Sequence, residues 1–161
     1  MNLRKYVTIK STMSKESIWK RLYNVTEPYS ERNAPSLFEG SIDENSFRLY
    51  QLFNYGIGNL IRPEINGKLV QNNEYVELNL IFKLSTEMRI LFGAAFIISA
   101  ALISIQATTN WLKDCAMFPF GWEVDAGVVF VGYLIVMSTF YTKVKECTEK
   151  LLALSKGKIV Q

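Results

Sequence analysis

The chain has 161 residues, of which 49% are hydrophobic and 20% are charged, and its net charge is +3. This length fits one small folded domain together with a membrane element. The basic residues are too few and too dispersed for a nucleic-acid-binding surface, which concentrates them in a patch. Histidine is absent, and the two cysteines, Cys115 and Cys147, are too few for a disulfide framework or a thiolate metal site. We therefore expect no metal, no cofactor and no nucleic-acid partner.

The first part of the chain predicts a small strand-rich α+β domain. Residues 6–11 alternate apolar and polar side chains, which is typical of a strand. Ser14 then fits the N-cap of an amphipathic helix that carries Ile18 on its apolar face and ends before Pro28. The N-terminus lacks the apolar core of a signal peptide, so we expect residues 1–89 to form a cytoplasmic domain.

Further strands are predicted after this helix. They span residues 37–42, 47–53 and 75–84, and the last of these has the clearest alternation of apolar and polar side chains in the chain. The first two flank a short polar connection, residues 43–46, which predicts a hairpin. Residues 59–70 are a fourth candidate, which Pro63 restricts to a sheet edge or to the start of a strand.

Two apolar segments in the second half predict a transmembrane helical hairpin over residues 90–142. Residues 90–112 contain no charge, and about 20 residues cross a hydrocarbon core of roughly 30 Å. Residues 126–142 are also uncharged but are near the short end of the spanning range. We expect helices at about residues 90–110 and 124–142. The alternative for each is a buried helix in a soluble core, but the N-terminal domain is too small to enclose both.

The flanking charges predict the orientation of this hairpin. Five lysines follow the second segment, whereas Lys113 is the only basic residue in the connector. The positive-inside rule then places both termini in the cytoplasm, and we expect a multi-pass protein of the bacterial inner membrane. Residues 143–161 are predicted to be a cytoplasmic tail with an amphipathic helix that packs on the sheet; attachment of its lysines to the membrane surface is the alternative.

Two groups of residues in the hairpin are candidates for specific contacts. The aromatic residues expected to anchor the connector at the membrane interface are Trp111, Phe118, Phe120 and Trp122. A partner-binding loop is the alternative for this connector. The small residues expected to allow close contact between helices are Gly93, Gly127 and Gly132.

Three short segments, residues 38–42, 47–49 and 63–68, read FEGSI, FRL and PEINGK. Together with the strand and the two apolar segments that follow, they resemble a family of small uncharacterised bacterial membrane proteins. The resemblance covers most of the chain. It implies a strand-rich N-terminal domain, a two-helix transmembrane hairpin and a charged helical tail, and it implies no activity and no active site.

No catalytic motif is present: the sequence lacks GxGxxG, P-loop, HExxH and CxxC patterns. An enzyme that uses carboxylates or Tyr55 is therefore disfavoured. The leading hypothesis is a membrane-anchored, non-enzymatic protein whose cytoplasmic domain binds a partner or ligand near the bilayer, with a protein partner or a second copy of the chain as candidates. The alternative hypothesis is a membrane immunity or defence effector that acts through its transmembrane hairpin.

Overall fold

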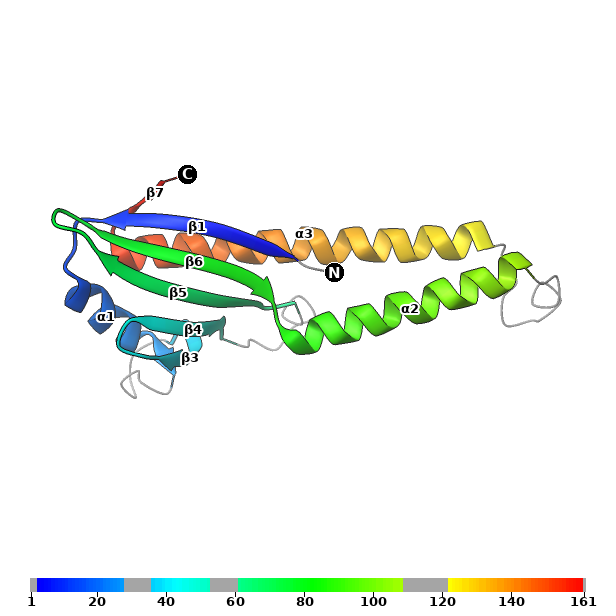
Figure 1. Ribbon diagram of the computed structural model, residues 1–161, viewed down its shortest axis with the longest axis horizontal. Helices are drawn as coiled ribbons and strands as arrows, with labels where there is room; N and C mark the ends of the chain where they lie inside the picture. The colour runs from blue at the N-terminus through cyan, green and yellow to red at the C-terminus, as the bar shows by residue number, and fades with distance from the viewer. Residues whose placement is uncertain (1–2, 28–35, 53–60, 109–121, 161) are drawn as a thin grey trace. The chain divides into compact units, whose positions relative to one another are not determined.

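The computed structural model describes residues 3–27, 36–52, 61–108 and 122–160 (Figure 1). The chain divides into two compact units. The first, here called the apolar unit, contains Thr86–Thr139. The second, here called the sheet domain, contains Asn2–Ser85 and Phe140–Gln161. The first and the last parts of the chain that the structure describes therefore belong to the same unit, and the segment between them belongs to the other.

The described residues form a mixed α+β structure with a seven-stranded sheet and three helices, which confirms the α+β class that the sequence predicts. The strands are β1 (Arg4–Ser11), β2 (Thr26–Glu27), β3 (Phe38–Ile42), β4 (Ser46–Gln51), β5 (Pro63–Gln71), β6 (Val76–Leu84) and β7 (Lys158–Val160). The helices are α1 (Lys15–Asn24), α2 (Thr86–Thr108) and α3 (Trp122–Ser155). The strand order is β2-β3-β4-β5-β6-β1-β7, and only the β2–β3 pair is parallel.

Helix α1 begins where its capping residue predicts. The side chain of Ser14 accepts a hydrogen bond from the Ser17 amide, so it satisfies a backbone donor that the first turn leaves free. Ile18 and Leu22 are buried on one face of the helix. On the same side, Trp19 packs edge-on against Phe47 of β4, with ring centroids 5.9 Å apart. Both the cap and the apolar face predicted from the sequence are confirmed.

The alternation of β6 decides which face of the sheet is buried. Its five inward-facing residues, Val76, Leu78, Leu80, Phe82 and Leu84, are all buried, as their spacing predicts. On β5 the inward-facing residues Ile65 and Leu69 belong to the same core. Pro63 is the first residue of β5, which lies between β4 and β6. Of the two positions that proline allows, the structure therefore shows the strand start.

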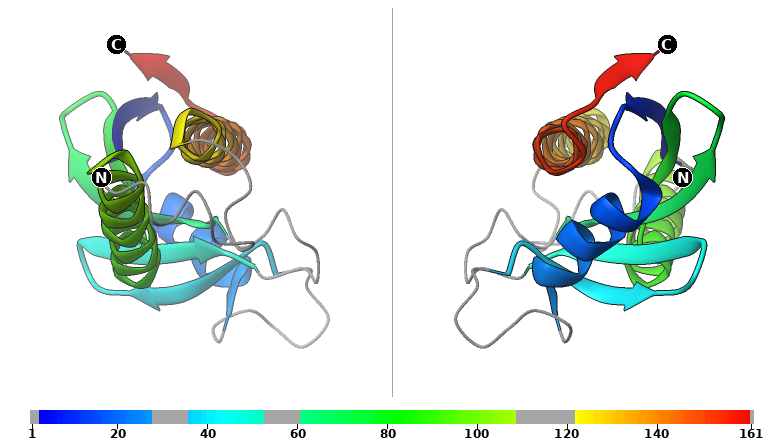
Figure 2. Two further views of the ribbon diagram at one scale, coloured as in Figure 1. Left: turned by 90° about the vertical axis from the view of Figure 1, so that its right-hand side faces the viewer. Right: turned by 90° about the vertical axis from the view of Figure 1, so that its left-hand side faces the viewer.

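The C-terminal part of α3 covers this inner face. Phe140, Val144, Cys147 and Leu151 are buried at helical spacing within the sheet domain. Figure 2 shows α1 and this part of α3 on the same side of the curved sheet. The predicted tail helix is thus present and packs on the sheet, but it continues the second apolar segment in one 34-residue helix.

Strand β7 is not predicted by the sequence pattern. After α3 the chain reverses through Lys156, which has a φ of +47°, a left-handed conformation common at helix C-termini. Gly157 follows, and a Cβ there would lie 2.5 Å from Cγ2 of Ile9. This close approach lets β7 pair with β1 from Thr8 to Lys10. The chain's last strand therefore extends the sheet next to its first.

Helix α2 and the N-terminal part of α3, which precedes the part that packs on the sheet, are long and apolar enough to cross a membrane. Within the most apolar stretch of α2 no residue is buried. A buried core helix, the alternative considered for the first apolar segment, would show the opposite pattern. Exposed apolar side chains on these helices include Ile97 of α2 and Val128 of α3.

Gly40→Ala tests the close pairing of β3 and β4. Gly40 has a φ of +148°, and a Cβ there would lie 2.1 Å from the main-chain oxygen of Arg48. Because the neighbour is backbone, the two strands would have to separate. We expect a loss of about 2–3 kcal/mol in the free energy of unfolding, measured on the full chain in detergent by near-ultraviolet circular dichroism. The control is Gly132→Ala, where a Cβ meets open space and no loss is expected; equal losses would contradict the explanation.

Cys147 tests the packing of α3 on the sheet domain. Its thiol lies beyond the apolar segment, is buried next to Gln51, and has a pKa that burial raises to about 11. In a Cys115→Ser background, we expect alkylation at pH 8 to be at least about a hundred-fold slower in the folded chain than after unfolding, because both access and thiolate are lacking. Moving the thiol to exposed position 20, with Lys20→Cys and Cys147→Ser, should abolish the protection. Rapid alkylation of folded Cys147 would contradict the packing.

Candidate functional site

The outer face of the sheet, opposite α1 and α3, is polar and carries the candidate site. Paired residues of neighbouring strands share a face, so the strand register places the outward side chains in rows. One row consists of Ser41, Arg48, Asn66, Ile81 and Tyr6. The rows on either side consist of Ser46, Lys68, Asn79 and Thr8, and of Tyr50, Glu64, Lys83 and Arg4. These three rows bring side chains from β1 and from β3 to β6 together.

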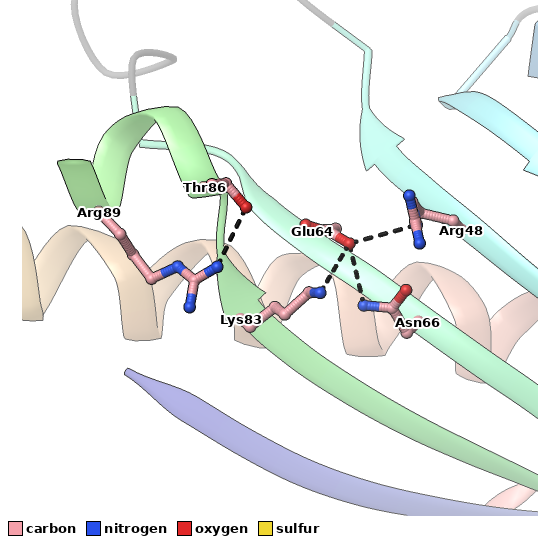
Figure 3. A network of polar contacts seen from close by, with 6 residues as sticks. All are labelled: Arg48, Glu64, Asn66, Lys83, Thr86 and Arg89. Atoms are coloured by element: carbon pink, nitrogen blue, oxygen red, sulfur yellow. Dashed lines mark hydrogen bonds and ion pairs between the residues drawn. The ribbon is translucent and has the colours of Figure 1, made fainter. Parts of the chain in front are cut away.

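Glu64 is the centre of the polar contacts on this face (Figure 3). Although it points away from the apolar core, it is only 4% exposed. Its Oε1 lies 3.0 Å from Nζ of Lys83 and 3.3 Å from Nε of Arg48, and it accepts a hydrogen bond of 3.2 Å from Asn66. A buried carboxylate is stable only when it is paired in this way. One negative charge is thus shared by two positive charges, which leaves the cluster with a net positive charge.

The guanidinium group of Arg48 is held at Nε, and its two terminal amino groups are available to a ligand. Glu64 contacts its Nε, while 61% of its side chain is exposed. Within the described residues, its two terminal amino groups make no hydrogen bond and no ion pair. A guanidinium fixed at Nε presents these two donors side by side, the geometry that binds carboxylates and phosphates bidentately.

A shallow concavity of about 640 Å³ lies beside Arg48. Its polar and charged lining residues are Ser41, Asp43, Ser46, Arg48, Asn66, Lys68 and Asn79. Lys68 is exposed and has no charged partner among the described residues. Asn79 accepts a hydrogen bond of 3.0 Å from Thr8 through its Oδ1, so its amide nitrogen is left as a donor. The concavity therefore offers cationic and neutral hydrogen-bond donors to a small polar ligand.

Lys10, on the same face of the sheet, makes a separate set of contacts with Glu77 and Tyr75. Nζ of Lys10 lies 3.3 Å from Glu77 and 4.5 Å from the centre of the Tyr75 ring. Its hydrogen bond to Glu77, and then its contact with Tyr75, raise the pKa of Lys10. Because this ammonium group is already paired, we do not include it in the candidate site.

The described outer face carries cationic and neutral hydrogen-bonding groups that can hold an anion. Within the described ranges no group of three His, Cys, Asp or Glu side chains lies close enough to hold a metal ion. In the apolar unit, Figure 3 also shows Arg89, which donates a hydrogen bond of 3.0 Å to Thr86 one helical turn before it in α2. That contact is local to the start of the helix.

None of the described residues of this face was singled out from the sequence. Trp111, Phe118 and Phe120 lie outside the described residues, and Trp122 is the first residue of α3, whose side chain is not described there. The three glycines, Gly93, Gly127 and Gly132, lie on α2 and α3, and a Cβ at each would have no neighbour within 4 Å. The expected interface anchoring and the expected helix contacts therefore stay predictions.

Arg48, Glu64, Lys68 and Lys83 were not predicted as site residues. The alternation of β4, β5 and β6 does assign each of them to the polar face. Their grouping follows from the register, in which Glu64 pairs with Lys83 and Arg48 with Asn66. The pairing of acidic Glu64 with basic Lys83 across β5 and β6 is the signal that could have identified the group, but it can be recognised only when the register is known.

No protein-family model, no curated protein and no solved structure matches this chain.

Glu64→Gln tests whether the buried carboxylate organises the outer face. The neutral amide would leave Arg48 and Lys83 close together without a counter-charge, so we expect a loss of about 2 kcal/mol in the free energy of unfolding. The matched control is Glu77→Gln, which removes a carboxylate from the more exposed pair with Lys10 and should cost less than about 1 kcal/mol. Chemical unfolding of the full chain in detergent gives both values. Losses of the same size would show that burial of Glu64 has no special role.

Proposed function

We propose that this chain is a membrane-anchored, non-enzymatic binding protein. In this proposal α2 and the apolar part of α3 form a transmembrane hairpin, and the sheet domain presents its outer face to a ligand or partner. The observation that carries the proposal is the exposure of two long apolar helices attached to a well-packed domain.

Lipid is the simplest environment for the exposed apolar side chains of these helices. Ile97 is 69% exposed and Val128 is 67% exposed, and both lie in uncharged segments. Soluble monomers rarely expose apolar patches of more than a few hundred Å². The 23 residues of α2 rise about 34 Å, enough to cross a hydrocarbon core of about 30 Å. A bilayer therefore accounts for both the length and the composition of the helices.

The pairing of β1 with β7 supports a hairpin over a single crossing. β1 precedes both apolar helices in the chain and β7 follows them, yet the two strands share backbone hydrogen bonds in one sheet. Both ends of the sheet domain must then lie on the same side of a membrane, so the chain between them crosses an even number of times. The lysines that follow the second segment favour the cytoplasmic side.

A binding role is supported by the outer face. Arg48 and Lys68 present positive charge next to a concavity, and Glu64 holds Arg48 in place. The alternative, an immunity or defence effector, depends on the hairpin glycines, and no contact of the described residues favours it over the anchored binding protein.

The double substitution Ile97→Arg with Ile98→Arg tests the anchor. Two charges at the centre of a transmembrane helix cost about 5–7 kcal/mol of insertion free energy, so we expect the variant to leave the carbonate-resistant membrane fraction. The wild-type chain should remain in that fraction until detergent is added.

The matched control is Ile159→Arg with Val160→Arg, which places the same charges on exposed apolar residues of β7 and should leave the membrane fraction unchanged. Reporter fusions at the two ends should both report the cytoplasmic side. A wild-type chain that stays in the soluble fraction, or fusions that report opposite sides, would overturn the proposal.

A further inference from the structure

We infer that the concavity on the outer face of the sheet binds the phosphate group of a polyhydroxy compound, such as a glycerol phosphate or the head group of a phosphatidylglycerol lipid. This inference rests on the proposed binding function and names the ligand chemistry of the same site. It follows from the spacing of two open cations, from the neutral groups between them and from the position of one carboxylate.

Two cations flank the concavity without neutralising partners at their outer ends. Arg48 faces outward with both terminal amino groups open, and Lys68 makes no ion pair among the described residues. Arg48 pairs with Asn66 across β4 and β5, so Lys68, two residues further along β5, is its diagonal neighbour on the same face. Diagonal neighbours are roughly 7–8 Å apart at the backbone. This spacing leaves room for one tetrahedral anion between the two side chains.

The buried carboxylate keeps Arg48 in this position. Glu64 binds Nε of Arg48 and also Nζ of Lys83. The guanidinium is therefore held at Nε, while its two terminal amino groups face the solvent. An arginine held in this way loses less conformational freedom when it binds an anion than a free surface arginine does. Phosphate and carboxylate are the anions that match its two parallel donors.

The other lining residues favour a ligand that also carries hydroxyl groups. Asp43 lines the concavity and would repel a purely anionic ligand, but its carboxylate accepts hydrogen bonds from hydroxyl groups. The hydroxyls of Ser41 and Ser46 and the amide of Asn79 lie around the same space. A phosphate ester of a polyol satisfies both kinds of group, whereas an acidic peptide offers carboxylates without hydroxyls.

The test uses the full chain in nanodiscs of phosphatidylcholine and measures binding of glycerol 3-phosphate by calorimetry. We expect saturable binding, no binding of glycerol alone, and roughly ten-fold weaker binding for Lys68→Gln and for Arg48→Gln, since each removes a charge-assisted hydrogen bond. The side chain of Lys68 makes no hydrogen bond and no ion pair among the described residues, so Lys68→Gln should keep the stability of the wild type. The control is Lys20→Gln, which removes an exposed charge from α1 and should bind as the wild type does.

A second arm distinguishes a lipid head group from a soluble phosphate. Nanodiscs that contain phosphatidylglycerol should weaken the apparent binding of glycerol 3-phosphate if lipid head groups reach the concavity, and should leave it unchanged if the natural ligand is soluble. Absence of saturable binding in phosphatidylcholine discs, or an equal loss for Lys20→Gln and Lys68→Gln, would overturn the inference. Membrane fractionation of the same variants reports on the anchor separately, so the two proposals can fail independently.

Discussion

β1 pairs with β6 along its length and with β7 over residues Thr8 to Lys10, and this double pairing connects the two ends of the chain. The segment between β6 and the C-terminal part of α3 therefore begins and ends at the sheet domain, although it belongs to the apolar unit. The return is fixed by burial, because Phe140, Cys147 and Leu151 fill the inner face of the same sheet. Ser11 donates a hydrogen bond to the carbonyl of Ser155 at the end of the helix. The sheet domain is thus complete only when the chain has passed through α2 and α3 and has added β7 to the sheet.

This pairing of the first and last strands has a consequence for the order in which the domain can be completed. The sheet cannot complete its inner face until the second apolar segment has been made and has returned, because the covering helix is the direct continuation of that segment. The sheet domain and the apolar unit are linked along the chain by one uninterrupted helix, α3, and by the single residue Ser85 between β6 and α2. In the proposed topology, assembly of the sheet would therefore depend on correct insertion of the hairpin.

The two faces of the sheet use different physical means for different purposes. The inner face is apolar and gains stability from burial, with Leu78, Leu80 and Phe82 almost completely enclosed. The outer face buries one carboxylate, Glu64, and compensates it with positive charges from two neighbouring strands. That arrangement contributes less to stability than apolar packing does, since desolvation of the charges offsets much of their attraction. It fixes the direction of Arg48 instead, which is what a binding surface requires.

The sequence by itself determined the features that depend on local periodicity. The two apolar segments, the Ser14 cap and the inward side of β6 were all predictable, because chain length, hydrogen bonding of the cap and strand alternation involve only nearby residues. The tertiary structure decided the pairing of β2 with β3 and of β7 with β1, and the continuity of α3. It also decided the grouping of Arg48, Glu64 and Lys83, which lie on three strands and meet only through the register. Register is a relation between distant segments, set by how the whole core packs, and alternation within one strand carries no information about it.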